Sequence, residues 1–279
     1  MPRKLFVTKA DGSREPFDAE KVKRTALRAG ADDALADKVA EEVEKRAYDG
    51  ISTHIILEIA LKLLDRMEPA VAARYDLKGA IMRLGPAGFI FEQLLAEMLR
   101  AWGWKTSVHR MLKGKCVTHE VDVVAEKGDE RAMIEAKYHN QPGIFTGIKD
   151  ALYVVARFED LVAAKTKESF FTEPWLATNT KFSGDVIQYG ECRGLKLLGW
   201  KYPVKENIQY MLERKMLYPV TVIRNLDKLT LQKLADAELM FCSDLLVSTK
   251  ELFRKTGIKE NRLAQLQQIA KGVCEKQSA

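Results

Sequence analysis

The sequence lacks several features that would assign it to a membrane or repeat class. No apolar run approaches the ~18 residues that a membrane-spanning helix needs, and the opening residues Met1-Pro2-Arg3-Lys4 are followed by a strand-like segment rather than a signal sequence. Internal repeats and low-complexity tracts are absent as well. We therefore expect a cytoplasmic protein that has no membrane partner.

Cysteine is scarce. The chain has four cysteines, Cys116, Cys192, Cys242 and Cys274, and none of them forms a C-x-x-C pair. This spacing argues against a zinc finger, a zinc ribbon or a disulfide framework. A Walker A pattern is also missing, so we do not expect ATP hydrolysis by a P-loop.

Basic residues only slightly outnumber acidic residues. Lys and Arg number 45 and Asp and Glu 39, which gives a net charge of +6 and a pI near 9.0. Such an excess favours a polyanionic partner without establishing one. The chain has 279 residues, 47% of them hydrophobic, which is globular composition and long enough for roughly two domains.

The first section, residues 1–85, begins with a hairpin pattern. Residues 4–9 read as a strand, Asp11-Gly12 as the turn and residues 13–17 as the return strand. Asp18 is placed to cap the first helix, and Pro69 to start the last one. The section therefore predicts a small β-hairpin followed by about four helices.

The second section, residues 86–203, alternates helices and strands. A helix is expected at 88–102, three strands at 105–110, 117–125 and 131–137, then a helix at 147–165, a strand at 175–178 and a helix at 182–193. This order predicts an α/β sheet flanked by helices. The third section, residues 204–279, is expected to be helical throughout.

Chemistry is concentrated on one predicted hairpin. A turn at Gly128-Asp129 pairs the strands so that Asp122 lies opposite Glu135 and Glu120 opposite Lys137. Opposed Cβ atoms are ~4.5–5.5 Å apart, so two carboxylates at that distance repel unless a cation lies between them. Mg²⁺ or Mn²⁺ suits such oxygen ligands.

A metal at Asp122 and Glu135 would activate water and stabilise charge on a scissile phosphate. The backbone carbonyl of Ala136 could be a further ligand, Lys137 could orient the attacking water, and His139 could contact phosphate. The alternative is that these charges are merely solvated on an exposed hairpin face, which is common in antiparallel sheets.

The pattern Asp122…Glu135-Ala136-Lys137 resembles the PD-(D/E)xK nuclease signature in its D…ExK form. The element order also resembles the restriction-endonuclease-like core (α-β-β-β-α-β), most closely in its Mrr-like and archaeal Holliday-junction-resolvase-like branch. A Phe-Glu pair on the first core helix supplies another acidic residue in those proteins, which implies Glu92 here. Glu120 departs from the signature, since it stands where proline is expected.

Residues 3–84 resemble the ATP-cone, the nucleotide-sensing module of ribonucleotide reductases and their repressors. The resemblance implies that ATP or dATP acts as an effector. By position, the nucleotide site would be lined by Val7, Lys9, Glu15, Lys21 and Thr53. Ala10 departs from the family, which usually has arginine after the lysine; the alternative is a degenerate cone that serves as a docking module.

The last section looks like a helix-hairpin-helix type module around Thr256-Gly257-Ile258, although Gly257 alone would fit an ordinary helix C-cap. Residues 250–279 carry seven Lys and Arg against three Asp and Glu. Helix N-terminal amides and this charge would favour binding to the DNA backbone.

These patterns predict three domains: an ATP-cone-like domain (1–85), a PD-(D/E)xK nuclease domain (86–203) and a helical DNA-binding module (204–279). The predicted function is Mg²⁺-dependent hydrolysis of DNA phosphodiester bonds, of restriction or of repair and junction type, by a chain that could act as a homodimer. The alternative is a non-enzymatic, nucleotide-sensing regulator that binds DNA.

Overall fold

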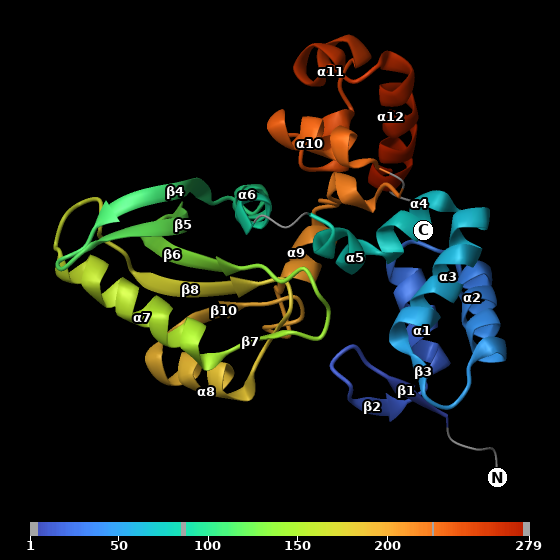
Figure 1. Cartoon of the computed structure of the whole chain (residues 1–279), viewed down its shortest axis with the longest axis horizontal. Coiled ribbons are helices and arrows are strands. Elements are labelled where there is room, and N and C mark those ends of the chain that lie inside the picture. The colour runs from blue at the N-terminus through green and yellow to red at the C-terminus, as the bar shows by residue number, and fades with distance from the viewer. Residues whose placement is uncertain (1–4, 85–87, 225, 276–279) are drawn as a thin grey trace. The chain divides into compact units, whose positions relative to one another are not determined.

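The computed structural model describes residues 5–84, 88–224 and 226–275, and it has a mixed α/β architecture (Figure 1). The chain forms two compact units. Unit 1 comprises Met1–Ile81 and Tyr218–Ala279, and unit 2 comprises Met82–Leu217. The expected boundary at residues 85/86 lies outside the described residues. Among the described helices, none has the length and apolarity to cross a membrane.

The first part of unit 1 is the expected hairpin with helices, plus a third short strand. Its elements are β1 (Phe6–Thr8), β2 (Arg14–Pro16), α1 (Ala19–Arg28), α2 (Asp33–Arg46), β3 (Ile51–Ser52), α3 (Thr53–Met67), α4 (Pro69–Tyr75) and α5 (Leu77–Met82). The sheet order is β2-β1-β3. Strand β3 pairs in parallel with β1 and places Ser52, which caps α3, beside Thr8.

Local sequence explains where these helices start. Asp18, Asp32 and Ser52 are the N-caps of α1, α2 and α3, and each side chain accepts a backbone N–H two or three residues further on. Such caps satisfy donors that the first turn leaves free. Pro69 begins α4 as expected, because its missing N–H costs nothing there.

The C-terminal part of unit 1 is helical. Its helices are η1 (Val220–Val222), α10 (Lys228–Asp236), η2 (Cys242–Leu245), α11 (Thr249–Thr256) and α12 (Glu260–Cys274). Gly257 caps α11 with φ +62°. Helix α12 packs on α4, where the buried Arg74 donates to the carbonyl oxygens of Ala29 (2.6 Å) and Gly272 (3.0 Å).

Unit 2 is built on a five-stranded sheet in the order β10-β8-β6-β5-β4. Its elements are α6 (Gly88–Ala101), β4 (Lys105–Lys113), β5 (Thr118–Lys127), β6 (Glu130–Lys137), β7 (Phe145–Thr146), α7 (Ile148–Ala163), β8 (Glu173–Thr178), β9 (Lys181–Phe182), α8 (Gly184–Arg193), β10 (Lys196–Leu198) and α9 (Ile208–Arg214). The predicted helices and strands are present in the predicted order.

Helices cover both faces of this sheet. Val124 and Met133 belong to one core with Val154 and Leu161 of α7. Val123 and Ile134 point the other way and are also fully buried, and α6 packs against β4, β5 and β6. Figure 1 shows α7 and α8 together on one face. Successive side chains along β5 and β6 therefore pack alternately against α7 on one face of the sheet and α6 on the other.

The hairpin of β5 and β6 has the predicted register, with Val123 opposite Ile134 and Lys127 opposite Glu130. The paired stretch ends at Val123, before Asp122 reaches Glu135. The expectation that regular pairing continues to Glu120 is wrong, because the Asp122 side chain, rather than a strand carbonyl, accepts the N–H of Ala136 at 2.8 Å.

Strands β4 and β5 are both irregular near this point. Val121 and Val124 lie in the same core cluster, although residues three apart on a regular strand face opposite sides. His109 has φ +51°, and its neighbours pair with Val121 and Val123, so His109 stands opposite Asp122. At His109 and Asp122, therefore, both strands switch the side of the sheet to which their side chains point. Asp122 does not take part in the regular pairing of β5 with β6.

Candidate active site

Three carboxylates from three elements meet in unit 2. Glu92 comes from α6, Asp122 from the irregular part of β5 and Glu135 from β6. The Glu135 side chain is 6% exposed and that of Glu92 is 14% exposed. Glu92 therefore faces the other two acids rather than solvent, which the sequence left open.

Burial and crowding change the acidity of this group. Burial, then the charge of Asp122, raises the pKa of Glu92 to about 7, although His109 opposes the change. Burial, then the charge of Glu135, raises the pKa of Asp122 to about 6, against the opposing hydrogen bond from Ala136. Desolvation and like charges both raise a carboxyl pKa, and here burial contributes more than the neighbouring acids to making the ionised forms of Glu92 and Asp122 unfavourable.

Two cations hold Glu135 from opposite sides. Lys137 Nζ lies 2.7 Å from Glu135 Oε1, and Arg157 of α7 pairs with Oε2. Arg157 also donates to the carbonyl oxygen of Glu120 (2.7 Å) and to the Tyr153 hydroxyl (2.7 Å). Glu135 is therefore held at both carboxylate oxygens.

Lys137 is held as an ammonium group. Burial by itself lowers the pKa of Lys137, but the hydrogen bond from Lys137 to Glu135 and the charges of Glu135, Asp150 and Asp122 outweigh it, and the net pKa is raised. Asp150 Oδ1 at the start of α7 is 3.9 Å from its Nζ. Lys137 is therefore suited to donating hydrogen bonds rather than to accepting a proton.

The chain segment after Lys137 is fastened to β8. Asn179 accepts the N–H of His139 at 2.9 Å and donates to its carbonyl oxygen at 2.7 Å. The buried Thr178 hydroxyl donates to the Lys137 carbonyl oxygen at 2.8 Å, and Thr146 Oγ1 joins Thr178 to the His139 ring. The His139 ring is therefore tied into this hydroxyl chain, and the Lys137 backbone is fixed in place.

Two acidic side chains of the described residues, and not three, could bind the same metal ion. Within the described ranges, no three His, Cys, Asp or Glu side chains stand close enough to hold an ion together. Asp122 and Glu135, which are close enough for each to act on the other's charge, fit the usual Mg²⁺ arrangement of one or two carboxylates with several waters. Ala136 contributes its N–H to Asp122.

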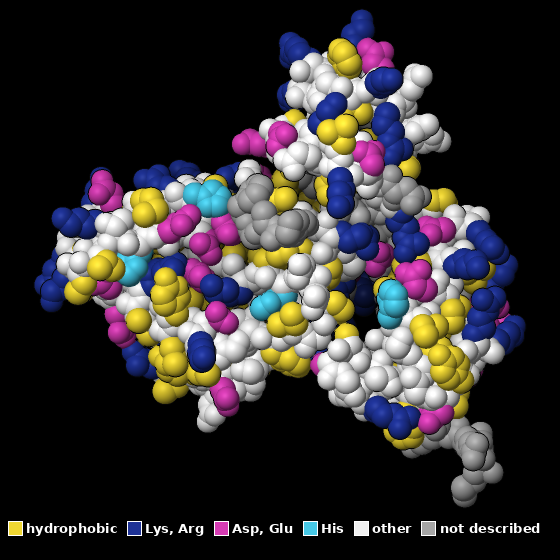
Figure 2. Space-filling model, viewed as in Figure 1, with side chains coloured by type: hydrophobic (Ala, Val, Ile, Leu, Met, Phe, Trp, Pro, Cys, Tyr) yellow, Lys and Arg dark blue, Asp and Glu magenta, His cyan; other side chains and the backbone are white. Residues whose placement is uncertain are grey.

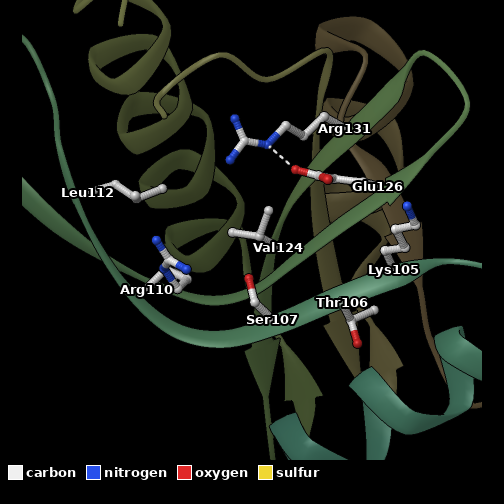
Figure 3. Close-up of a pocket in the computed structure, with 8 residues that line it drawn as sticks. All are labelled: Lys105, Thr106, Ser107, Arg110, Leu112, Val124, Glu126 and Arg131. Carbon is white, nitrogen blue, oxygen red and sulfur yellow. Dashed lines mark ion pairs between the residues drawn. The ribbon is translucent and has the colours of Figure 1, made fainter. Parts of the chain in front are cut away.

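A cleft of about 250 Å³ lies further along the strands (Figure 3). It is lined by Lys105, Thr106, Ser107, Arg110, Leu112, Val124, Glu126 and Arg131. Ser107 and Arg110 both face it although they are three residues apart, which is the same change of face seen at His109. Glu126 in this cleft forms an ion pair with Arg131. The other two cations of the lining, Lys105 and Arg110, are exposed to solvent.

Sequence reasoning missed His109, Asp150 and Arg157. Arg157 carried a signal: it lies on the same helical stripe as Val154 and Leu161, which are fully buried. A cation in an apolar stripe needs a buried partner. His109 left no such signal, since its role depends on the strand irregularity. Figure 2 shows acidic, basic and histidine side chains side by side on unit 2.

The residues expected to bind nucleotide gather around β1 in unit 1. Glu15 lies opposite Val7, and Lys9 and Lys21 both reach its carboxylate, at 2.6 and 3.4 Å. The hydrogen bond from Lys9 is the main reason that the pKa of Glu15 is lowered. Thr53 is the first residue of α3, directly after the cap Ser52.

Arg14 is a further cation beside β1, and the sequence patterns did not point to it. It pairs with Asp49 at 3.0 Å and stacks over the Phe6 ring. Arg14 lies opposite Thr8, so it shares the face of Phe6 and stands on the other face from Glu15. The cations placed together for a polyphosphate are therefore the two lysines beside Glu15.

A separate cluster fastens the β4–β5 turn to α7. Asp160 accepts the N–H groups of Cys116 (2.9 Å) and Val117 (3.3 Å) and lies 2.8 Å from the His119 ring. Gly114 is required here, since a Cβ at that position would lie 2.1 Å from Asp160 Oδ2. The hydrogen bond from His119 is the main reason that the pKa of Asp160 is lowered to about 2.

Replacing Asp160 with asparagine should therefore lower the melting temperature at pH 7. A lowered pKa means that the ionised carboxylate stabilises the fold above its unfolded pKa, near 3.9, and that this contribution disappears as the pH falls toward about 2. The difference in melting temperature between Asp160→Asn and the wild type should disappear as the pH falls over that range. Asp129→Asn, in the exposed β5–β6 turn, is the control; a gap that is constant with pH would contradict the assignment.

Comparisons with known proteins support part of this picture. A family model described as "ATP cone domain" matches residues 5–77, and one described as "AF1548-like, C-terminal" matches residues 218–274. The predicted cone is thus confirmed as a domain.

The matching relatives are uncharacterized proteins. An uncharacterized protein of Archaeoglobus fulgidus is 42% identical over 179 residues, which are 64% of this chain and 99% of that protein. A second one from the same organism is 54% identical over 44 residues, or 16% of this chain and 92% of its own length. The crystal structure of "Protein of Unknown Function AF1548" is 40% identical, with a TM-score of 0.60 over 67% of this chain and 98% of that one.

Proposed function

The chain belongs to the AF1548-like family, and we propose that it is a Mg²⁺-dependent endonuclease that hydrolyses DNA phosphodiester bonds under the control of its ATP cone. The observation that carries the proposal is the meeting of Glu92, Asp122 and Glu135 beside the ammonium of Lys137. Buried acids whose pKa values are raised by burial and by like charge, beside an ammonium group, are typical of functional sites.

The donor set fits a divalent ion. The raised pKa values of Glu92 and Asp122 mean that their ionised forms are unfavourable, first because of burial and then because of like charge, and a bound cation would favour those ionised forms. Asp122 and Glu135 would hold the ion, with Ala136 O as a further oxygen ligand. When bound, the ion would supply a polarised water and stabilise charge at the scissile phosphate.

The protein's own groups have separate tasks. Lys137 would donate a hydrogen bond to the attacking water or to a phosphate oxygen. Arg157 fixes Glu135 in place, and Asn179 and Thr178 fix the backbone beside Lys137. Glu92 would be the auxiliary acidic residue. These groups sit on four elements that pack against one another, which gives the fixed geometry that catalysis needs.

The order of elements also supports a nuclease. In α6-β4-β5-β6-α7-β8 the acids of the motif stand on the second and third strands, as in the restriction-endonuclease-like core that the sequence resembles. DNA is the substrate that best fits this resemblance and the basic residues 250–275, which lie on α11, α12 and their flanks.

A cleavage assay tests the proposal. The full chain is incubated with linear, supercoiled and four-way-junction DNA, in Mg²⁺ or in EDTA, each with and without ATP. We expect strand cleavage that requires Mg²⁺, and the preferred DNA form separates a restriction role from a repair role. DNA that stays intact in all Mg²⁺ reactions would reject the enzyme and favour the alternative, a nucleotide-sensing regulator, which the cone match supports on its own.

The cone makes its own prediction. ATP should raise the melting temperature of the wild type, because a ligand that binds only the folded state stabilises it. Lys21→Ala should lose most of that rise, since Lys21 is one of two lysines that meet at Glu15. Lys45→Ala on α2 is the matched control and should keep it. A wild type that shows no shift with ATP or dATP would reject nucleotide sensing.

A further inference from the structure

Tryptophans and lysines gather on unit 2 away from the carboxylates. The surface is formed by Trp102, Trp104, Lys127, Trp175, Lys196 and Lys215, and we name it the Trp–Lys surface. The three tryptophans are half-buried and the three lysines are exposed. These residues come from the α6–β4 link, from β5, β8 and β10, and from the end of α9.

Two of the rings form the centre of the surface. Trp104 and Trp175 meet edge to face, with ring centroids 5.5 Å apart. Lys127 Nζ lies 5.7 Å from the Trp104 ring, and Lys196 Nζ lies 5.6 Å from the Trp175 ring. Lys127 and Lys196 thus each place an ammonium group against one of the two rings.

The surface continues through Trp102. Its ring is 5.4 Å from Lys215 Nζ and 6.0 Å from the Tyr210 ring. Its Nε1 donates to the Met211 carbonyl oxygen, and its own carbonyl oxygen accepts from Lys127. Lys127 thus links the Trp102 backbone to the Trp104 ring, and we call the three indoles together with Tyr210 the platform.

Charge on the platform is mainly positive. Glu173 pairs with Lys196 at 2.5 Å and accepts the Trp175 indole N–H at 2.7 Å. It thereby orients the ring and neutralises one lysine. The ammonium groups of Lys127 and Lys215 instead meet a carbonyl oxygen and aromatic faces. The platform therefore combines flat apolar faces with cations that are available to a phosphate.

This surface is separate from the acidic cluster. Glu92 lies near the start of α6, whereas Trp102 directly follows its last residue. Ten residues of helix span ~15 Å. A ligand on the platform would thus leave the carboxylates free.

We propose that the Trp–Lys surface binds single-stranded DNA. Successive bases would stack on the indoles while the lysines shift from the ring faces to the phosphates. Aromatic stacking with a cationic groove is how proteins hold single strands without reading sequence, and a duplex hides the base faces that such stacking needs. The binding itself is independent of the nuclease. Its consequence rests on the proposed function: the substrate would be DNA with a single-stranded segment, such as a branch or a tail.

Binding is measured in EDTA by fluorescence anisotropy, with a labelled oligo(dT) of about 20 nucleotides and a blunt duplex of equal length, since one such site covers ~4–16 nucleotides. The wild type should bind the single strand more tightly than the duplex and show tryptophan quenching. Trp104→Leu should weaken binding roughly 5- to 150-fold, which corresponds to the loss of one stacked base.

Variants that replace lysines of the surface test the same proposal if the Trp104→Leu protein does not fold. Lys127→Ala with Lys215→Ala should weaken binding and reduce the salt dependence by about 0.7 for each phosphate that is no longer neutralised. Lys167→Ala, an exposed lysine after α7, should bind as the wild type does. Equal affinity for both DNA forms, or an unchanged affinity in the double lysine variant, would overturn the proposal. Because EDTA prevents cleavage, a failed nuclease assay leaves this result unaffected.

Discussion

Replacing Asp122 with asparagine is expected to lower the rate of Mg²⁺-dependent DNA cleavage by about 10²- to 10³-fold, the range seen when one fixed electrostatic group is removed from an active site. The substitution keeps the shape of the side chain and an oxygen that can accept the N–H of Ala136. It removes the negative charge that, with Glu135, would hold the ion. The measurement is a single-turnover cleavage time course.

Stability separates this effect from misfolding. The pKa of Asp122 is raised to about 6, mainly by burial, so the ionised form is unfavourable in the folded protein and stability falls as the pH rises through that value. Asp122→Asn should therefore melt at the same or a higher temperature at pH 7. Glu126→Gln, at the far end of β5, is the control for cleavage. An Asp122→Asn protein that cuts as fast as the control would refute the assigned role.

Arg157→Met is expected to destabilise unit 2 by about 3 kcal/mol, because it leaves Glu135 Oε2 buried without its cation while Lys137 holds only Oε1. Arg157 supplies the contact to Glu135 Oε2 and also binds the Glu120 carbonyl oxygen and the Tyr153 hydroxyl. Methionine fills a similar volume and replaces none of these bonds. Urea unfolding at pH 7 measures the change.

Arg193→Met is the matched control for this destabilisation. Arg193 also pairs with a glutamate, Glu159, but both side chains are largely exposed, at 45% and 58%. Such surface pairs contribute ~0–1 kcal/mol. If the two variants are destabilised equally, the Arg157–Glu135 pair does not organise the site.

Patterns local in the chain predicted much of the fold. The turn at Gly128-Asp129 fixed the register of the β5–β6 hairpin, because a two-residue turn leaves little choice. The N-cap Asp18 and the first-turn residue Pro69 marked helix starts correctly. Each of these features depends on neighbours within a few residues, which is why the sequence alone reveals them.

Features that depend on distant parts of the chain were not predictable in the same way. Strand β3 has two residues and exists only because it pairs with β1. The change of face at His109 and Asp122 breaks the alternation on which strand predictions rest. The helical projection left the direction of Glu92 undecided, and packing of α6 on the sheet settled it. Arg157 reaches Glu135 because α7 lies over β6, and the sequence of α7 alone does not reveal that position.

A titration with Mn²⁺, followed by electron paramagnetic resonance, tests the pair of carboxylates most directly. At pH 8, above the pKa values of Glu92 and Asp122, the full chain without nucleotide should bind Mn²⁺, and a variant with both Asp122→Asn and Glu135→Gln should lose that binding. Equal Mn²⁺ binding by the two proteins would contradict the account, because the ion would then be held elsewhere.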